Sequence, residues 1–289
     1  MDQKVESEDS EFVKFWNEVL VPKFIDWKHV LVGGLSQHSE GVLPLLEIYH
    51  GDRVLDAGAG FGDTACMLAE RVGPEGEVVG MDCCDAFLEF GREDAARRSL
   101  DNVRFEVADV ETYPFQGDYD MVFSRFGTMF FSNPVPALRN MRMALKPGGR
   151  LTHIVWRARA DNPWLNAAKD VVLAHLPPPD DDAQSCGPGP FSMANEEMVR
   201  GMMKSAGFED ITFDRVDASV RMGNDIEDSI GFQMALGPAG EVVREAGDVA
   251  TQKDAEIRAD LRELLRPHAT DDGVWMDSSS WVISARNPG

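Results

Sequence analysis

The sequence predicts an α/β fold in which a mostly parallel sheet is flanked by helices. From residue 54 onward, short apolar runs typical of buried strands alternate with helical patterns, and the first three of these runs lead into an aspartate. This alternation is typical of parallel sheets, because parallel neighbours need a crossover connection. A chain of 289 residues with 43% apolar content can also bury one large core, with or without a lid.

A glycine-rich turn follows the first strand. The strand leads into Asp56, Gly58, Gly60 and Gly62 follow at alternate positions, and a helical pattern begins at Asp63. Glycines so placed allow a sharp turn and let a ligand lie against the backbone. The acid ahead of the glycines would repel a pyrophosphate but suits a ligand that carries an ammonium and a sulfonium. An ordinary tight turn between strand and helix is the alternative interpretation.

Two further strands also lead into acids. Asp82 ends the run Glu77–Asp82, close to the offset of about 20 residues at which a carboxylate binds ribose hydroxyls. A helix N-cap is an alternative that is compatible with this role. Asp109 follows the run Asn102–Val107, where a solvated loop acid is the alternative.

Five motifs in order over residues 51 to 157 resemble those of the class I S-adenosylmethionine-dependent methyltransferases. Besides the three acid-ended strands, they include Tyr119–Ser124 with its aromatic continuation, and Pro-Gly-Gly-Arg-Leu before the strand Leu151–Trp156. The resemblance implies a Rossmann-like sheet of seven strands, in the order 3-2-1-4-5-7-6 with the seventh antiparallel. The later strands are expected at Ile211–Val216 and Ser280–Ala285.

Within this family, the segments Gly51–Gly60 and Arg125–Phe131 look most like the ubiquinone/menaquinone C-methyltransferase-like branch. The chain differs in having Ala59 where many members carry cysteine. Its long region after the sixth strand also departs from the compact quinone enzymes, which counts against a quinone acceptor.

The resemblance implies S-adenosylmethionine as the cofactor, with Asp82 on the ribose and Asp109 on the adenine amino group. The cofactor-binding residues expected from these motifs are Asp56, Ala57, Gly58, Gly60, Gly62, Thr64, Asp82, Cys83, Asp109, Val110, Ser124, Arg125 and Phe126.

The acceptor is expected outside the carboxyl ends of the strands. Residues there that are predicted to line its pocket are Phe130, Phe131, Trp156 and Arg157. Methyl transfer relies mainly on positioning, and a base is needed only if the acceptor must lose a proton. The candidates for catalysis are His38 and Arg125, although His38 also suits a capping or surface role and Arg125 equally suits an ion pair with a structural acid. His153, inside the fifth strand, is interpreted as structural.

The predicted organisation has four parts. We expect a disordered tail (1–10), an N-terminal helical lid (11–48), a methyltransferase core (49–217 and 278–289) and a helical cap inserted between strands six and seven (218–277). Packing of the N-terminal helix against the sheet is the alternative to a lid. The Pro/Gly/Asp-rich loop at 177–191 is of a length that is usually functional or mobile.

Composition narrows the function. A net charge of −22 and a pI near 4.6 argue against a nucleic-acid substrate and favour a small-molecule acceptor. No apolar run approaches 18 residues, so no membrane span is expected. Four cysteines without a C-x-x-C pair predict no metal site and a reduced, cytoplasmic setting. A homodimer is compatible with the sequence.

Two other functions compete with methyl transfer. A nicotinamide-dependent oxidoreductase is disfavoured by the glycine spacing and by Asp56. A non-catalytic member that binds the cofactor as a sensor or scaffold is compatible with the three intact acids. Arsenite methylation would need converging cysteines, and the sequence gives no sign that its four converge; they are Cys66, Cys83, Cys84 and Cys186.

Overall fold

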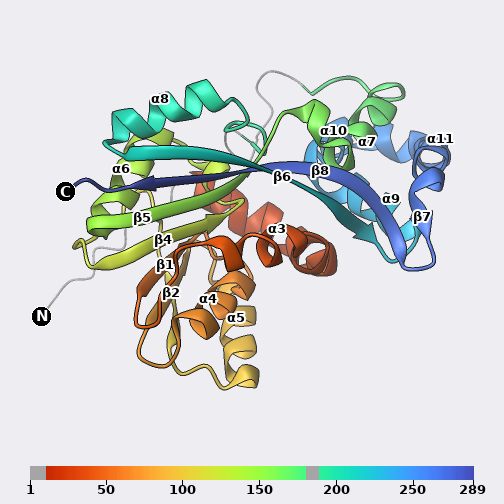
Figure 1. The fold of residues 1–289 in the computed structure, drawn as a ribbon. Coiled ribbons are helices and arrows are strands. Elements are labelled where there is room, and N and C mark those ends of the chain that lie inside the picture. Colours follow the sequence, from red (N-terminus) through yellow and green to blue (C-terminus); the bar gives the residue numbers. More distant parts are fainter. Residues whose placement is uncertain (1–10, 180–188) are drawn as a thin grey trace, which may run out of the picture.

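The sheet confirms the predicted strand order (Figure 1). The computed structural model describes residues 11–179 and 189–289, so the tail predicted at 1–10 lies outside the described residues. Its strands are β1 (Arg53–Ala57), β2 (Glu77–Asp82), β3 (Val103–Val107), β4 (Tyr119–Arg125), β5 (Leu145–Trp156), β6 (Glu209–Gly223), β7 (Ala269–Thr270) and β8 (Gly273–Arg286). They pair in the order β3-β2-β1-β4-β5-β8-β6, with β7 beside β8. Strands β1 to β5 run parallel, and β8 is antiparallel to both neighbours, as expected.

Helices cover both faces of this sheet. In Figure 1, α4 and α5 pack side by side below it, and α6 and α8 lie above it. The helices after the first strand are α4 (Asp63–Val72), α5 (Asp85–Arg98), α6 (Pro134–Ala144), α7 (Pro163–Leu173), α8 (Glu196–Ala206), α9 (Ile226–Ala235), α10 (Gly237–Ala246) and α11 (Asp248–Leu265). Because both faces are covered, the middle of the central strands is mostly apolar, and Val54 and Leu55 of β1 are fully buried.

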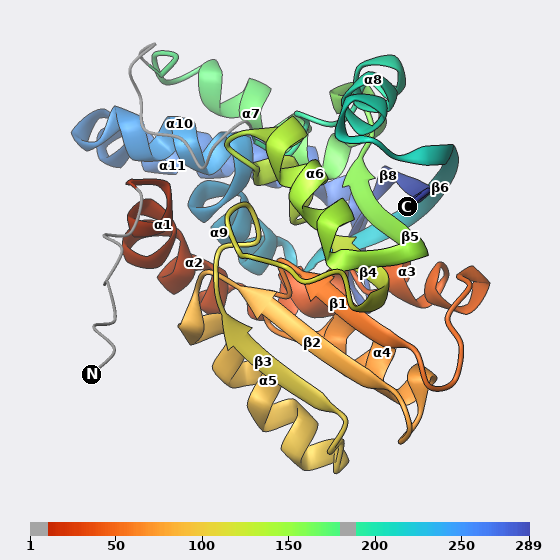
Figure 2. The same cartoon turned by 90° about the vertical axis from the view of Figure 1, so that its left-hand side faces the viewer.

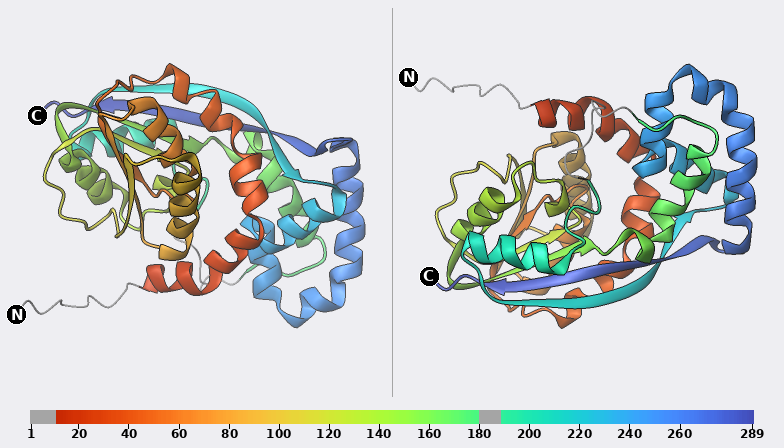
Figure 3. Two further views of the ribbon diagram at one scale, coloured as in Figure 1. Left: turned by 90° about the horizontal axis from the view of Figure 1, so that it is seen from below. Right: turned by 90° about the horizontal axis from the view of Figure 1, so that it is seen from above.

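The N-terminal region consists of short helical pieces. They are α1 (Glu11–Phe15), a π-helical turn (Trp16–Leu20), α2 (Val21–Asp26), a second π-helical turn (His29–Gly34), α3 (Gln37–Glu40) and a 3₁₀ turn (Leu43–Leu45). In Figures 2 and 3, α1 and α2 lie between the sheet domain and helices α9 to α11, whereas α3 lies against β6. The helical pattern was predicted, but its division into π-helical and α-helical turns was not.

Two strands are longer than expected. β6 continues to Gly223 and β8 begins at Gly273, so both extend into the region 218–277 that was predicted as a helical cap. Beyond the end of β5, they pair mainly with each other as a two-stranded arm. Only one face of this arm is fully covered, with Val220 and Met222 buried. The short strand β7, which was not expected, pairs with β8 near the tip of the arm.

Helices α9 to α11 lie at the end of this arm (Figure 1). Their buried residues Phe232, Ile257 and Leu261 belong to the same apolar cluster as Val54 and Leu55 of the central strand. Burying each such side chain contributes about 1.5–3 kcal/mol relative to leaving it exposed. Among the described residues, no helix combines the length and the apolar composition needed to cross a lipid bilayer.

Candidate functional site: an acidic cavity beside an aromatic one

The glycine turn has the backbone that the sequence predicts. Gly58, Gly60 and Gly62 all adopt positive φ angles, of 70°, 52° and 75°. A Cβ atom at Gly62 would lie 2.6 Å from Gly91 Cα, so that glycine lets α4 and α5 approach each other. A Cβ atom at Gly60 would meet nothing within 4 Å. Gly60 therefore faces open space, and Gly62 is required for packing.

Asp82 holds the glycine turn in place. Its Oδ2 atom accepts a hydrogen bond from the backbone N–H of Gly60, and its Oδ1 atom accepts one from Cys84, both at 2.9 Å. Burial raises the pKa of this carboxyl group, and the backbone hydrogen bonds oppose that shift. Each oxygen keeps a second lone pair, so the carboxylate can still accept from a ligand.

Asp56 has a different position from the one expected. Its side chain is fully buried, and its Oδ2 atom accepts a hydrogen bond of 2.6 Å from the Thr64 hydroxyl. Burial raises the pKa of Asp56 to about 7, against the effect of the Thr64 hydrogen bond. Its Oδ1 atom has no hydrogen-bond partner in the described part of the chain. Asp56 thus stabilises the first turn of α4 through its contact with Thr64.

A cavity of about 190 Å³ lies over the glycine turn. Most of the predicted cofactor residues line it, namely Gly58, Gly60, Thr64, Asp82, Cys83, Asp109, Val110, Arg125 and Phe126. The described lining does not include the remaining four, which are Asp56, Ala57, Gly62 and Ser124. Of these four, Asp56 and Ser124 have fully buried side chains, and Gly62 packs against Gly91 of α5.

This smaller cavity is acidic. Its described lining holds the carboxylates of Asp63, Asp82, Asp109 and Glu111 and a single cation, Arg125. Such a surface attracts a positively charged ligand and repels phosphate groups. Sequence reasoning missed Asp63 and Glu111. The carboxylate of Glu111 accepts hydrogen bonds from the backbone N–H groups of Ser132 and Asn133. These bonds connect the loop after β3 to the start of α6.

Arg125 forms the ion pair that was one of its two expected roles. Its Nη2 atom donates to both carboxylate oxygens of Asp63, at 3.0 and 2.8 Å, and its Nη1 atom donates to Ser39 Oγ at 2.7 Å. The Arg125 side chain is only 9% exposed. It therefore fastens the N-terminal segment and α4 to the end of β4, on the wall of the smaller cavity.

The two histidines considered from the sequence are both enclosed. His38 is fully buried, and its ring nitrogens bond Ser280 at 2.9 Å and Ser278 at 2.7 Å. Burial lowers the pKa of His38 to about 4, so its ring is neutral near pH 7. A role as a base would require this packing to open. His153 is likewise buried and bonds Thr128 at 2.9 Å, in keeping with a structural interpretation.

A larger cavity of about 560 Å³ adjoins the smaller one. The two share six lining residues, all apolar, which are Trp16, Phe24, Leu31, Leu35, Phe126 and Phe130. Of the residues predicted for the acceptor pocket, Phe130 and Trp156 line the larger cavity and Phe131 lines the smaller. Arg157 instead stacks over Trp281 at 4.0 Å and pairs with Asp161 at 3.2 Å.

Phe126 forms the wall between the cavities and has strained backbone. Its φ angle is 57°, a left-handed value that is rare for a bulky residue and costs about 1–3 kcal/mol. The conformation is held by a 2.8 Å hydrogen bond from its N–H to Ile154 O and by stacking on Trp156, with ring centroids 3.8 Å apart. Strain of this kind is typical of ligand sites.

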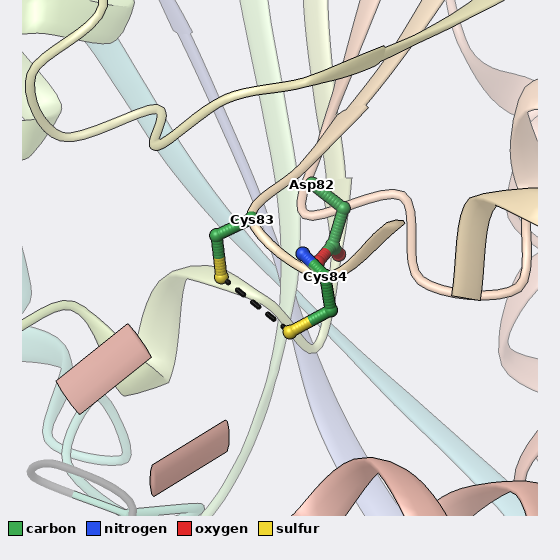
Figure 4. Close-up of side chains that lie close together, drawn as sticks. All are labelled: Asp82, Cys83 and Cys84. Carbon is green, nitrogen blue, oxygen red and sulfur yellow. Dashed lines mark hydrogen bonds between the residues drawn. The ribbon is translucent and has the colours of Figure 1, made fainter. Parts of the chain in front are cut away.

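Cys83 and Cys84 follow Asp82 side by side (Figure 4), with their sulfur atoms 3.7 Å apart. One ligand atom from each of these three residues lies within 4.8 Å of the others, which is close enough to surround a cation. The hydrogen bond with Cys83, together with burial, raises the pKa of the Cys84 thiol, which disfavours the thiolate that a metal requires. We therefore retain the prediction of no metal site.

Comparison with known proteins supports the family resemblance that the sequence motifs indicate. Residues 48–176 match the model of a methyltransferase domain. The chain is 32% identical over 226 residues to the ubiquinone/menaquinone biosynthesis C-methyltransferase UbiE of Ectopseudomonas mendocina, covering 74% of this chain and 88% of that protein. It is also 32% identical over 183 residues to the Edwardsiella ictaluri UbiE, covering 60% and 72%.

Solved structures share the fold. A putative methyltransferase from Bacillus halodurans aligns with a TM-score of 0.55 at 17% identity, over 86% of this chain and 98% of that one. Phosphoethanolamine N-methyltransferase 2 of Haemonchus contortus, in complex with S-adenosyl-L-methionine, aligns with a TM-score of 0.57 at 16% identity, over 98% and 61%.

The chain belongs to the S-adenosylmethionine-dependent methyltransferase family. It is therefore a methyltransferase enzyme of the UbiE-like kind, and S-adenosylmethionine is its cofactor.

The glycine turn gives a testable contrast. Gly62→Ala is expected to destabilise the fold by about 2–4 kcal/mol, since left-handed strain and overpacking add. Gly60→Ala should cost only about 1 kcal/mol of stability from strain, but its methyl group should weaken S-adenosylhomocysteine binding. Denaturant unfolding and calorimetry measure both effects. Gly148→Ala is the control, with a φ angle of +77° and open space around its Cβ. Equal destabilisation by the first two substitutions would contradict the assignment.

Proposed function

We propose that this enzyme transfers the methyl group of S-adenosylmethionine to a small-molecule acceptor held in the larger cavity. The supporting observation is the pair of adjoining cavities, one acidic beside the glycine turn and one aromatic beneath the N-terminal helices, which share six apolar lining residues. An acidic cavity suits a donor that carries an ammonium and a sulfonium. The net charge of −22 supports a small acceptor over a nucleic acid.

In the proposed arrangement, Asp82 binds the ribose hydroxyls and Asp109 binds the adenine amino group. Gly60, with open space at its Cβ position, leaves room for the cofactor against the backbone. When bound, S-adenosylmethionine supplies an electrophilic methyl group. The shared rings of Trp16 and Phe126 suit a sulfonium, because aromatic faces attract cations.

Catalysis in this proposal rests on positioning. In-line displacement at a methyl group needs no acid for the leaving group, and holding the acceptor at about 3 Å supplies much of the rate enhancement. All six residues shared by the cavities are apolar, so they exclude water and orient the two reactants. We also propose a cytoplasmic location, supported by the free thiols of Cys66, Cys83 and Cys84.

Calorimetry tests the donor site, and a screen tests the reaction. S-adenosylhomocysteine is expected to bind with micromolar-range affinity and to raise the Tm, whereas NAD is expected to do neither. Phenols, quinols and amines are then screened for release of S-adenosylhomocysteine. A preference for NAD would overturn the proposal. Tight S-adenosylhomocysteine binding without transfer to any acceptor class would favour a sensor or scaffold instead.

A further inference from the structure

We propose that the acceptor is an aromatic molecule that carries an anionic group, such as a carboxylate, and that Lys23 and Lys169 bind this group in the larger cavity. The proposal rests on the proposed function, because it assigns the chemistry of the acceptor to that cavity. Four observations support it: the charge of the lining, the ion pairs already made there, the aromatic walls and the position of the cations.

The two cavities have opposite charge. The described lining of the larger cavity holds four cations and one acid, namely Lys23, Arg159, Lys169, Arg244 and Glu241. The smaller cavity holds four acids and one cation. Because the whole chain has 50 acidic and only 28 basic residues, composition alone would give acidic walls in both. The basic lining is therefore a local feature of the larger cavity.

The cations differ in how far they are already engaged. Arg244 pairs with Glu245 at 2.5 Å and with Glu241 at 3.7 Å. Arg159 lies 5.0 Å over the ring of Phe191. No ion pair within the described chain engages Lys23 or Lys169. These two ammonium groups are the ones left to meet a ligand.

Glu241 is the counter-ion at the centre of this group. Burial raises the pKa of Glu241; the charges of Arg244, Lys169 and Lys23 oppose the rise, and the charge of Glu245 adds to it. Burial also lowers the pKa of Lys23, and the charge of Arg244 lowers it further. Two carboxylates, Glu241 and Glu245, thus stand against these three cations. A further anion, brought by a ligand, would relieve the repulsion that remains among the cations.

The aromatic side chains of the larger cavity favour an aromatic acceptor. Its rings include Phe24, Phe130, Trp156, Trp164 and Phe232. Offset or edge-to-face contacts with such rings favour an aromatic ligand over an aliphatic one of equal size. A volume of about 560 Å³ is within the range of small-molecule sites.

The positions of the cations orient the acceptor. All four line only the larger cavity, whereas the apolar residues between the cavities line both. The anionic group therefore binds away from the glycine turn, and the uncharged part of the acceptor faces the methyl donor. The substrate class is an aromatic acid whose reacting atom lies away from its acidic group.

A pair of fluorescent probes that differ in charge tests this selectivity. 8-Anilinonaphthalene-1-sulfonate and the neutral N-phenyl-1-naphthylamine have the same ring system, and only the first carries an anion. Both are titrated into the full chain saturated with S-adenosylhomocysteine. The wild-type protein is expected to bind the sulfonate more tightly, at one site.

Substitutions then locate the anion site. Lys23→Met and Lys169→Met should each weaken the sulfonate about tenfold, as loss of a charged hydrogen bond does, and leave the neutral probe unchanged. Glu241→Gln should tighten the sulfonate, because it frees the cations. Lys204→Met, an exposed position on α8, matches the change in net charge and should alter neither affinity.

Equal affinity of the two probes for wild-type protein would overturn the proposal. Equal weakening of both probes by the lysine substitutions would also overturn it. The same holds for weaker sulfonate binding by Glu241→Gln, because this variant retains every cation. These outcomes are distinct from failure of the proposed function, which would appear earlier, as an absence of S-adenosylhomocysteine binding.

Discussion

Asp82→Ala is expected to weaken S-adenosylhomocysteine binding by about 1–3 kcal/mol, as loss of a charged hydrogen-bond partner does. Two effects combine, because the ribose loses its acceptor and the backbone N–H groups of Gly60 and Cys84 lose theirs. The glycine turn is then held less firmly. Calorimetry at a fixed pH measures the change in Kd.

Two further variants sharpen this experiment. Asp82→Asn keeps one side-chain oxygen as an acceptor, so its binding defect should be smaller than that of the alanine variant. Asp101→Ala removes an exposed carboxylate between α5 and β3 and should bind like the wild type. If Asp82→Ala binds normally, the ribose contacts another part of the cavity and the proposed cofactor geometry is wrong.

Arg125→Met is expected to lower the free energy of unfolding by about 3–5 kcal/mol, since it leaves a partly buried charge without its partner. The Asp63 side chain is only 16% exposed and would face the other acids of the cavity alone. The substitution also releases Ser39, and with it the N-terminal segment. Denaturant unfolding with and without S-adenosylhomocysteine measures both consequences.

A double-mutant cycle isolates the ion pair. In an Asp63→Asn background, Arg125→Met should cost clearly less, because no buried carboxylate remains unpaired. Arg266→Met, which removes an exposed pair with Glu263, should have a far smaller effect. Additive losses in the cycle would show that Arg125 acts through packing and not through its pairing with Asp63.

The strand order was predictable because its signals are local in the chain. Most of the parallel strands are apolar runs followed by a helix, as at Val54 and Leu55, and the glycine turn marks the first of them; β3 instead leads directly to β4. The length of β6 and β8 was not predictable, because the arm they form is fully covered on one face only. Charged residues such as Asp217 and Arg221 alternate with buried ones there and resemble a surface loop in sequence.

The part of the candidate site that lies within local sequence motifs was also predictable. Gly60 and Asp82 could be placed because turn and strand end lie at fixed positions in the motif. Asp56 could not, since only the fold shows that its side chain turns inward to Thr64. The larger cavity was beyond prediction, because Lys23 and Lys169 come together only when the N-terminal helices meet α7 and α10.

In the proposed arrangement, the stretch of chain between β6 and β8 contributes to the acceptor cavity and not to the donor cavity. Helices α9 to α11 form one continuous stretch of chain between these strands, and they supply Phe232, Glu241 and Arg244 to the larger cavity. No residue of that stretch lines the smaller cavity in the described structure. An insertion of this kind can be exchanged between relatives as a unit, which would let the enzyme acquire a new substrate while its methyl source stays the same.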